Sequence, residues 1–423
     1  MSRAPRKSGR AGVRLNRAGA VRLLLERAEP PAAVSCAPEE ALGLVLAEAA
    51  SAECDVPEFA VSLRDGYALR AADIAGACPE RPVRLPVGGR LTAESLPGME
   101  LPRGGAVRVL TGGPVPPGAN VVVAEEHVSL EEGAVAFTAC APERGNVLGR
   151  GADLPSGMVL GGAGEEIDPG LAAVLVRARV RRVAVLPRPC CAVFGLGSEL
   201  SDPYAGRAAA AVESGRMPGD NLVQMTGLLT RAGGRVVSRG VLPDDAGAIA
   251  AALAELFPGG AGPSLVLTSG GTGRSERDLA RRAALRAGFE LLFDGVEVRP
   301  GFGMFAAVRS VEGRASLLLG VPGPPGAVFG CLHAVLPPLL RALRGLAQEP
   351  PERVRLEAPL ASRFDCEWLV PCMLRRAPDG LLATPLEQGS PLAALARARG
   401  VVAVPPGAAL RAGDEAELLR FCS

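Results

Sequence analysis

Lysine and histidine are nearly absent from this chain of 423 residues. Lys7 is the only lysine, so neither a Walker-A lysine nor a Schiff-base lysine is available for catalysis. The two histidines, His127 and His333, make a Ser-His-Asp mechanism an unfavourable interpretation. Carboxylates that work with a divalent metal ion are the chemical tools that remain.

Several other features are missing too. The ten cysteines include no Cys-x-x-Cys pair, which argues against a zinc site and favours reduced thiols. Although 48% of the residues are hydrophobic, no uninterrupted apolar run has the roughly 18 to 20 residues of a membrane span. The basic segment 1–17 lacks the apolar stretch of a signal peptide or anchor. A net charge of +1 provides no broad basic surface for nucleic acid. We therefore expect a cytoplasmic protein that binds neither membranes nor nucleic acid.

The chain is rich in glycine turns that follow short apolar strands. One stretch runs from Ser264 to Asp278, where Leu-Val-Leu leads into Thr268-Ser269-Gly270-Gly271-Thr-Gly. Glycine permits a tight turn whose N–H groups point outward at a helix N-terminus, and such a turn binds anions. Taken alone, the stretch is better explained as a plain strand-to-helix connection, because Ser275 and Asp278 have the spacing of a helix cap.

Two similar turns flank this one. Residues 191–194 lead into Gly195-Leu196-Gly197-Ser198-Glu199, and residues 317–319 lead into Gly320-Val-Pro322-Gly323-Pro-Pro-Gly. In open α/β sheets, ligands bind at the carboxyl ends of the strands. Three such turns within one α/β pattern therefore predict a crevice for a phosphorylated or otherwise anionic ligand.

The order of the patterns predicts a multidomain α/β protein. Alternating strands and helices over 185–344 predict a three-layer α/β domain with a mostly parallel sheet. Short strands and turns predict a β-rich inserted domain over 54–144 and a small C-terminal β-domain over 352–423. Residues 13–53 and 145–184 are expected to form a helical linking region. In that region one helix starts at Asn16, a second is opened by Pro38, and a third covers 170–177.

The first of these helices predicts a dimer. Val21, Leu24 and Leu25 form an apolar stripe that precedes any complete domain. Because such a stripe needs a surface to cover it, we expect a homodimer built through the linking region.

Two acidic residues of the N-terminal half stand in turn-like sequences. Asp65 and Gly66 lie between apolar flanks, as in a hairpin, and Asp153 lies in a loop rich in glycine and proline. On their own, both acids are better explained as turn residues than as catalytic groups.

Taken in order, the motifs resemble those of the molybdopterin molybdenumtransferase family, which includes the gephyrin E domain. The resemblance covers nearly the whole chain. It is carried by Pro57-x-Phe59 with Ser62-x-x-Asp65-Gly66-Tyr67-Ala68, Thr111-Gly112-x-Pro114-x-Pro116-x-Gly118-Ala119, Gly151-x-Asp153, Gly197-x-Glu199-Leu200, Thr268-Ser269-Gly270-Gly271 with Asp278, Pro300-Gly301, and Val321-Pro322-Gly323.

The resemblance implies a homodimer that inserts molybdate into adenylylated molybdopterin and releases AMP with the help of Mg²⁺. A molybdopterin adenylyltransferase is then a candidate partner. The catalytic residues that it implies are Asp65, Asp153, Glu199 and Asp278, with Glu199 and Asp278 also holding the metal. The ligand-binding residues that it implies are Thr111, Thr268, Ser269, Gly270, Gly271, Arg299, Pro322, Gly323 and Ser390. This chemistry agrees with the predicted use of carboxylates, a metal ion and an anion-binding crevice.

The chain also departs from the family pattern, and the departures leave two main hypotheses. The family usually has serine, threonine, asparagine and serine where this chain has Gly195, Leu196, Pro324 and Ala327. Phe302 and Val370 also depart from its pattern. The retained acids favour an active enzyme. The lost hydrogen bonds, worth about 1.5 to 3 kcal/mol each to a charged ligand, favour a diverged paralogue that binds molybdopterin, its tungsten form or a partner protein without efficient chemistry. A nucleotide hydrolase is a third, weaker hypothesis because the N-terminal half also matches. Neither molybdate nor tungstate is singled out.

Overall fold

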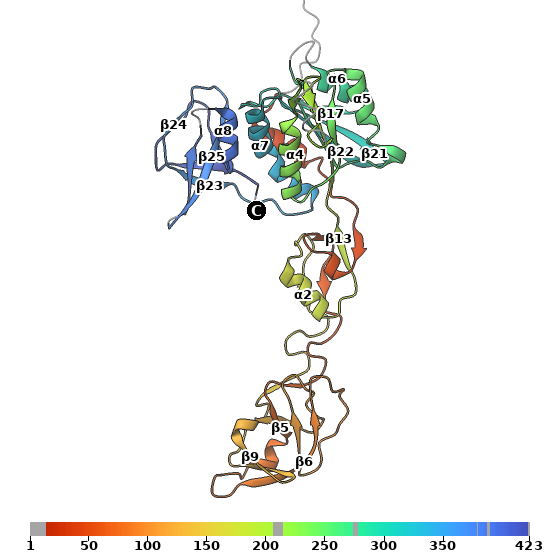
Figure 1. Ribbon diagram of the computed structural model, residues 1–423, viewed down its shortest axis with the longest axis vertical. Coiled ribbons are helices and arrows are strands. Elements are labelled where there is room, and N and C mark those ends of the chain that lie inside the picture. The colour runs from red at the N-terminus through yellow and green to blue at the C-terminus, as the bar shows by residue number, and fades with distance from the viewer. Residues whose placement is uncertain (1–13, 206–214, 274–277, 379, 387–389, 422–423) are drawn as a thin grey trace, which may run out of the picture. The chain divides into compact units, whose positions relative to one another are not determined.

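The computed structural model describes residues 14–205, 215–273, 278–378, 380–386 and 390–421 (Figure 1). Contacts divide the chain into two units. The larger unit contains 1–34, 43–47 and 186–423, and the smaller contains 35–42 and 48–185. The four-part division of the sequence is a finer partition than these two units, and its boundaries stay a prediction.

A six-stranded sheet forms the centre of the larger unit. Its spatial order is β17 (Arg235–Leu242), β14 (Cys190–Leu196), β18 (Leu265–Ser269), β22 (Arg314–Val321), β21 (Phe305–Val311) and β19 (Glu290–Asp294). The first four strands pair in parallel. Strand β21 pairs antiparallel with β22, and β19 pairs antiparallel with β21. The expected mostly parallel sheet is therefore confirmed.

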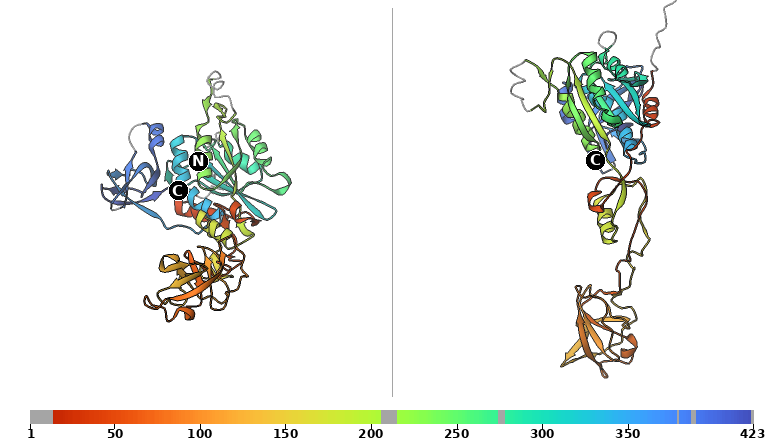
Figure 2. Two further views of the ribbon diagram at one scale, coloured as in Figure 1. Left: turned by 60° about the horizontal axis from the view of Figure 1, so that its bottom comes forward. Right: turned by 90° about the vertical axis from the view of Figure 1, so that its right-hand side faces the viewer.

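Helices cover both faces of this sheet, as the sequence predicts (Figures 1 and 2). One face carries α1 (Arg17–Leu25), α4 (Asp220–Arg231) and α7 (Pro325–Leu343), and the other carries α5 (Ala246–Ala254) and α6 (Leu279–Arg286). Alternate strand residues supply the two cores, so that Leu265 and Leu267 pack on the first face and Val266 on the second. These layers confirm the three-layer α/β prediction.

Helix α1 packs on its own unit, which removes the stated reason for a dimer. Asn16 caps the helix as predicted, because its Oδ1 accepts the Gly19 N–H at 2.8 Å. Ala20 and Leu24 are buried in the same apolar cluster as α7, and Val21 packs against that cluster. The stripe is covered as expected, but by α7 of the same chain, so it gives no support to a dimer.

Helix α7 runs unbroken from Pro325 to Leu343, with Pro337 and Pro338 inside it. By length and composition it could cross a membrane, but 72% of its most apolar window is buried in the protein. Its side chains pack against the sheet on one side and against the C-terminal strands on the other. Packing within the larger unit therefore accounts for its hydrophobicity.

The C-terminal part closes into a small β-barrel beside α7 (Figure 2). Its strands are β20 (Val298–Arg299), β25 (Glu367–Ala377), β26 (Gly380–Pro385), β23 (Glu352–Leu356), β29 (Glu415–Leu419) and β27 (Gly400–Val404), and β27 pairs back to β25. Two shorter strands, β24 (Leu360–Ala361) and β28 (Ala409–Leu410), and helix α8 (Pro391–Arg397) complete it. The predicted small β-domain is confirmed.

The smaller unit contains the predicted β-rich domain. Its main sheet has the order β8 (Val121–Ala124), β5 (Gly66–Leu69), β7 (Ala106–Val109), β6 (Val83–Leu91), β10 (Ala134–Phe137) and β9 (Val128–Glu131). The unit also holds β3 (Ala50–Ser51), β4 (Val61–Ser62), β11 (Val147–Leu148), β12 (Val159–Gly161) and α2 (Pro169–Arg177). Helix α2 confirms the helix expected over 170–177, and Asp168 caps it by accepting the Leu171 N–H.

The second predicted N-terminal helix does not form. Pro38–Glu40 makes one 3₁₀ turn, and Val45–Leu46 is a short strand, β2. Gly43 between them has a φ of 71°, a left-handed conformation that ends a right-handed helix. Ala41, Val45 and Leu46 are buried, but from a turn and a strand and not from one face of a helix.

Candidate functional site

The chain connections of the large sheet mark the edge where a ligand crevice is expected. From β14 the chain passes through α4 to β17 on one side, and from β17 it passes through α5 to β18 on the other side of β14. The connections thus diverge between β14 and β18. In open α/β sheets this divergence, at the carboxyl ends of the strands, is where ligands bind.

The three glycine turns meet at this edge, as predicted. Gly195 of β14 is in register with Ser269 of β18, and Ser269 with Val321 of β22. The N–H of Gly270 donates to the carbonyl of Val321 at 3.0 Å, so the second and third turns are joined. Three segments that lie far apart in sequence therefore form one surface.

Gly270 and Gly271 are required by this packing. Their φ angles are 96° and 60°, and a Cβ on Gly270 would lie 2.5 Å from the carbonyl oxygen of Leu196. Gly271 accepts the N–H of Ala280 at the start of α6, at 3.0 Å. The second turn thus passes directly over the first, which no side chain at these positions would allow.

A buried asparagine links the second and third turns. Asn221, near the start of α4, donates from Nδ2 to Ser269 Oγ at 2.8 Å and to the carbonyl of Gly323 at 2.6 Å. Thr268 is also buried, and neither its hydroxyl nor Asn221 Oδ1 has a hydrogen-bond partner within the described part of the chain. Buried polar atoms without partners are uncommon and are satisfied by water or ligand.

Glu199 is the free acid of the first turn. Its side chain is exposed and has no hydrogen bond or ion pair among the residues that the structure describes. The carboxylate folds back over Gly197, where a Cβ would lie 2.7 Å from either oxygen. The neighbouring Ser198 is fixed by Asp244, since Ser198 N–H donates to Asp244 Oδ2 at 3.1 Å and Asp244 N–H donates to Ser198 Oγ at 3.0 Å. The loop is therefore held while the acid stays available.

Asp278, by contrast, is already engaged. Arg281, which is 8% exposed, donates from Nη1 to Asp278 Oδ1 at 2.7 Å and pairs through Nε with Asp294 Oδ1 at 2.5 Å. The same guanidinium donates to the carbonyl of Gly303 at 3.0 Å and lies 4.9 Å from the ring of Phe305. Asp278 thus belongs to an ion-pair network that holds α6, and this structural role competes with a catalytic one.

Arg299 and Ser390 lie at the barrel side of the larger unit. The exposed Arg299 guanidinium stacks on the ring of Phe364 at 4.5 Å. Ser390 Oγ accepts the Ala393 N–H at 3.5 Å and so caps α8. Pro322 and Gly323 follow β22 directly, and Gly323 approaches Gly270 closely enough that a Cβ would touch it at 3.6 Å.

In the smaller unit, Asp65 is bound to Thr111. Both the N–H and the hydroxyl of Thr111 donate to Asp65 Oδ1 at 2.7 Å, and they hold the pKa of this carboxyl below its usual value. Gly66 is not a hairpin residue but the start of β5, where a Cβ would lie 2.2 Å from the carbonyl oxygen of Val123. The pair therefore presents a carboxylate kept ionised by a neighbouring loop.

Asp153 is exposed, and its N–H donates to the carbonyl of Val56 at 3.0 Å. The more strongly bound acid nearby is Asp55, which accepts the Ser156 N–H at 2.8 Å and Arg150 Nε at 2.6 Å. These two donors lower the pKa of Asp55. Asp55 is a structural acid that the sequence argument did not single out.

Comparisons with known proteins fit this architecture. Residues 15–178 match the MoeA N-terminal region (domain I and II), and residues 192–342 match a probable molybdopterin binding domain. A molybdopterin molybdenumtransferase of Synechococcus elongatus is 30% identical over 89% of this chain and 91% of its own length. The chain belongs to the molybdopterin molybdenumtransferase family. Its members are transferases of molybdenum cofactor biosynthesis.

Two further relatives agree with this assignment. The molybdopterin molybdenumtransferase of Bacillus subtilis is 28% identical over 87% of this chain and 85% of its own. The crystal structure of the molybdopterin biosynthesis MoeA protein from Pyrococcus horikoshii has a TM-score of 0.82 and 25% identity, and the match covers 97% of this chain and all of that one. The family predicted from the motifs is therefore confirmed.

Four of the six positions that depart from the family pattern have distinct surroundings in the structure. Leu196 and Val370 are buried in apolar clusters, where they serve as core residues. Gly195 has space, because a Cβ there would only touch Leu200 and Val241 at 3.7 and 3.8 Å. Phe302 is exposed beneath the guanidinium of Arg14 at 4.5 Å.

The acids near the crevice suit a Mg²⁺ ion only in part. Mg²⁺ is commonly held by one or two carboxylates together with substrate phosphates. Glu199 fits this mode because its carboxylate is unpaired beside the turns. Asp278 fits less well because Arg281 holds it, and within the described ranges no three Asp, Glu, His or Cys side chains cluster as a metal cage.

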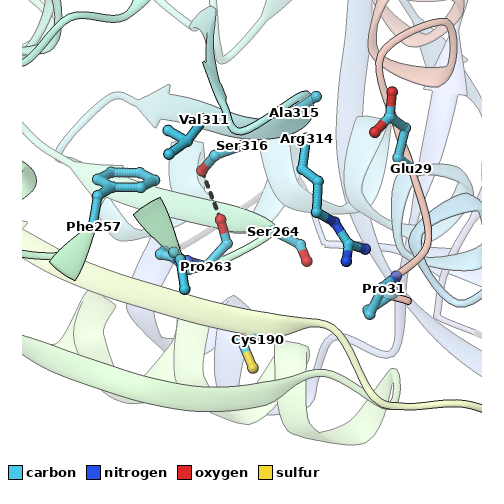
Figure 3. Close-up of a pocket in the computed structure, with 12 residues that line it drawn as sticks. Glu29, Pro31, Cys190, Phe257, Pro263, Ser264, Val311, Arg314, Ala315 and Ser316 are labelled. Carbon is cyan, nitrogen blue, oxygen red and sulfur yellow. Dashed lines mark hydrogen bonds between the residues drawn. The ribbon is translucent and has the colours of Figure 1, made fainter. Parts of the chain in front are cut away.

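A pocket of about 180 Å³ lies at the other end of the strands (Figure 3). Cys190 begins β14, Ser264 precedes β18, and Ser316 lies in the first part of β22. Figure 3 shows the side chain of Arg314 reaching between Ser264 and Pro31. Since ligands of open α/β sheets bind at the carboxyl ends, this pocket is not the predicted site.

Sequence reasoning missed the residues that organise the turns. The sequence patterns single out neither Asn221 nor Arg281 nor Phe364. The spacing of Asp278 and Arg281, three residues apart on a helix, is a signal that could have revealed their ion pair. The spacer 274–277, including Ser275 of the proposed helix cap, lies outside the described residues.

Proposed function

We propose that this chain inserts molybdate into adenylylated molybdopterin and releases AMP, at the crevice between β14 and β18. The observation that supports the proposal is the convergence of three glycine turns and the unpaired Glu199 at the point where the chain connections diverge. Outward amides at such turns bind phosphate groups, and the phosphoanhydride is the bond to be cleaved.

In this proposal each retained group has a separate task. The turns at Gly270 and Gly323 bind and orient the ligand, while Glu199 holds Mg²⁺ together with the substrate phosphates. When bound, the ion would neutralise the charge that develops as the phosphoanhydride breaks. A catalytic role is also proposed for Asp65, whose carboxylate is kept ionised by Thr111.

Measuring AMP release tests the proposal. Purified protein is incubated with adenylylated molybdopterin, Mg²⁺ and molybdate, with tungstate as a second oxyanion. Glu199→Gln should lower kcat by at least about 100-fold while the melting temperature is unchanged, as expected for a group that acts in the transition state. Glu290→Gln, at an exposed position on β19, is the matched control. Unchanged AMP release by Glu199→Gln would remove Glu199 from the mechanism.

A second candidate function is a paralogue that binds molybdopterin without efficient chemistry. It is favoured by Pro324, which has no N–H and no side-chain cap at the start of α7. The two candidates separate in one comparison. Tight binding of molybdopterin with no AMP release would establish the second, and binding with turnover the first.

A homodimer, a cytoplasmic location and an adenylyltransferase partner are further parts of the proposal. The smaller unit exposes several apolar side chains around α2 and β12, among them Val159 at 60% and Val176 at 51%. Exposed apolar side chains of this kind are typical of subunit interfaces. Sedimentation at micromolar concentration tests the dimer, and a monomer would contradict it.

A further inference from the structure

The carboxamide of Asn221 occupies the junction of α4 with the second and third turns. Its Nδ2 group donates two hydrogen bonds, one to Ser269 Oγ and one to the carbonyl of Gly323. Ser269 ends β18 and Gly323 follows β22. One side chain therefore fixes the distance between two turns that meet at the crevice.

The orientation of this carboxamide follows from its partners. The Gly323 carbonyl can only accept a hydrogen bond, so the atom 2.6 Å from it must be the nitrogen. Oδ1 is then the atom without a partner, on a side chain that is 8% exposed. A buried acceptor without a donor costs free energy, so a donor is expected at this oxygen in the working protein.

We propose that Asn221 is a positioning and specificity residue: its Nδ2 holds the second and third turns together, and its Oδ1 accepts a hydrogen bond from an N–H or O–H group of the bound ligand. The inference rests on the proposed location of the ligand at this crevice. Asn221 lies at the N-terminus of the 12-residue helix α4, and the unpartnered buried oxygen adds a specific acceptor to that end.

The chemistry of the acceptor decides which part of the ligand it takes. A carbonyl oxygen repels phosphate and molybdate oxygens, which are themselves acceptors. The group beside Asn221 is therefore an uncharged donor, such as a ring N–H of a pterin. The oxyanions of the ligand then belong with amides of the glycine turns other than that of Gly270, which donates to Val321.

Two substitutions separate the clamp from the ligand contact. Ser269→Ala removes one clamp bond but leaves Oδ1 in place, whereas Asn221→Ala removes both the clamp and the acceptor. Asn221→Ser is the milder variant if Asn221→Ala fails to fold. Thr230→Ala, which removes an exposed hydroxyl from the last turn of the same helix, is the control. Hydrogen exchange over 268–273 and 321–324 without ligand reports the clamp, and calorimetry with molybdopterin reports the contact.

We expect the amides of both turns to exchange faster in Asn221→Ala and Ser269→Ala than in the wild-type protein. Thr230→Ala should leave their exchange rates unchanged. Molybdopterin binding should weaken by about 10-fold or more in Asn221→Ala, the value of one hydrogen bond, and by a similar factor when Asn221→Ala is added to Ser269→Ala. The loss should appear in KM more than in kcat for AMP release.

Three other results would overturn parts of the inference. No further weakening when Asn221→Ala is added to Ser269→Ala would leave Asn221 as a clamp only, with water at Oδ1. Native binding by Asn221→Ala, while the wild-type protein binds and releases AMP, would refute the inference and leave the proposed function intact. A wild-type protein that does not bind molybdopterin would refute the proposed function itself.

Discussion

His333 should make the stability of the larger unit depend on pH. Its ring is buried within α7, 4.0 Å from the ring of Phe329 and 5.0 Å from that of Phe421. Burial lowers the pKa of His333 to about 4, and the charge of Arg231 adds to the effect. The contact of Nδ1 with the Phe329 carbonyl, at 2.8 Å, acts in the opposite direction.

The size of the effect follows from linkage. In the unfolded chain the histidine has a pKa near 6.5, so at pH 5 it binds a proton that the folded protein does not. Above pH 6.5 both states are neutral and the full stability is present. As pH falls from 8 to 5, unfolding should become easier by about 2 kcal/mol from this residue alone, and the loss continues toward pH 4.

Denaturant unfolding at several pH values measures this slope. Trp368, the only tryptophan, lies in β25. The next residue, Leu369, packs in the same apolar cluster as α7. The fluorescence of Trp368 therefore reports unfolding of this part of the protein. His333→Leu removes the titrating group and keeps the site apolar. The wild-type protein should lose about 2 kcal/mol more than this variant between pH 8 and 5. Equal slopes would show that His333 does not titrate differently in the two states, and the reasoning would be wrong.

Two further substitutions test the packing around the predicted site residues. Gly66→Ala places a Cβ 2.2 Å from the Val123 carbonyl oxygen and should destabilise the smaller unit by about 1 to 3 kcal/mol. The control Gly76→Ala has open space around the new Cβ and should leave thermal unfolding unchanged. Arg281→Met leaves two partly buried carboxylates without their cation and should cost about 2 to 4 kcal/mol, measured by denaturant unfolding against the exposed neighbour Arg282→Met. No loss of stability in Arg281→Met would show that the ion-pair network is dispensable.

The fold and the site edge could be predicted from the sequence because they depend on local patterns. Alternating strands and helices require a parallel sheet, and the carboxyl ends of parallel strands share one edge. The turns after residues 196, 269 and 321 were therefore expected together, and the registers confirm it. The capped starts of α1 and α2 follow from Asn16 and Asp168 in the same way.

What the sequence could not provide are the partners that lie far apart along the chain. The sequence near Asn221 does not indicate its hydrogen bonds to Ser269 and Gly323, which lie 48 and 102 positions away. Asp65 likewise gains Thr111 only when β5 and β7 pair. The apolar stripe of α1 showed that a surface must cover it, but not which one. Such pairings depend on tertiary packing, which a single sequence leaves open.

The departing positions acquire different meanings once their surroundings are known. Leu196 belongs to the apolar cluster beneath α5 and α6, and its Cδ1 lies 3.2 Å from where a Cβ on Gly271 would be. A threonine there would leave a void and bury a hydroxyl, so the family residue cannot simply be restored at this position. Gly195 differs, because a serine Cβ fits and would share the sheet face of Ser269. The first turn therefore has less polar surface and more core packing than the family pattern. Its acid, Glu199, nevertheless stays without a side-chain partner among the described residues.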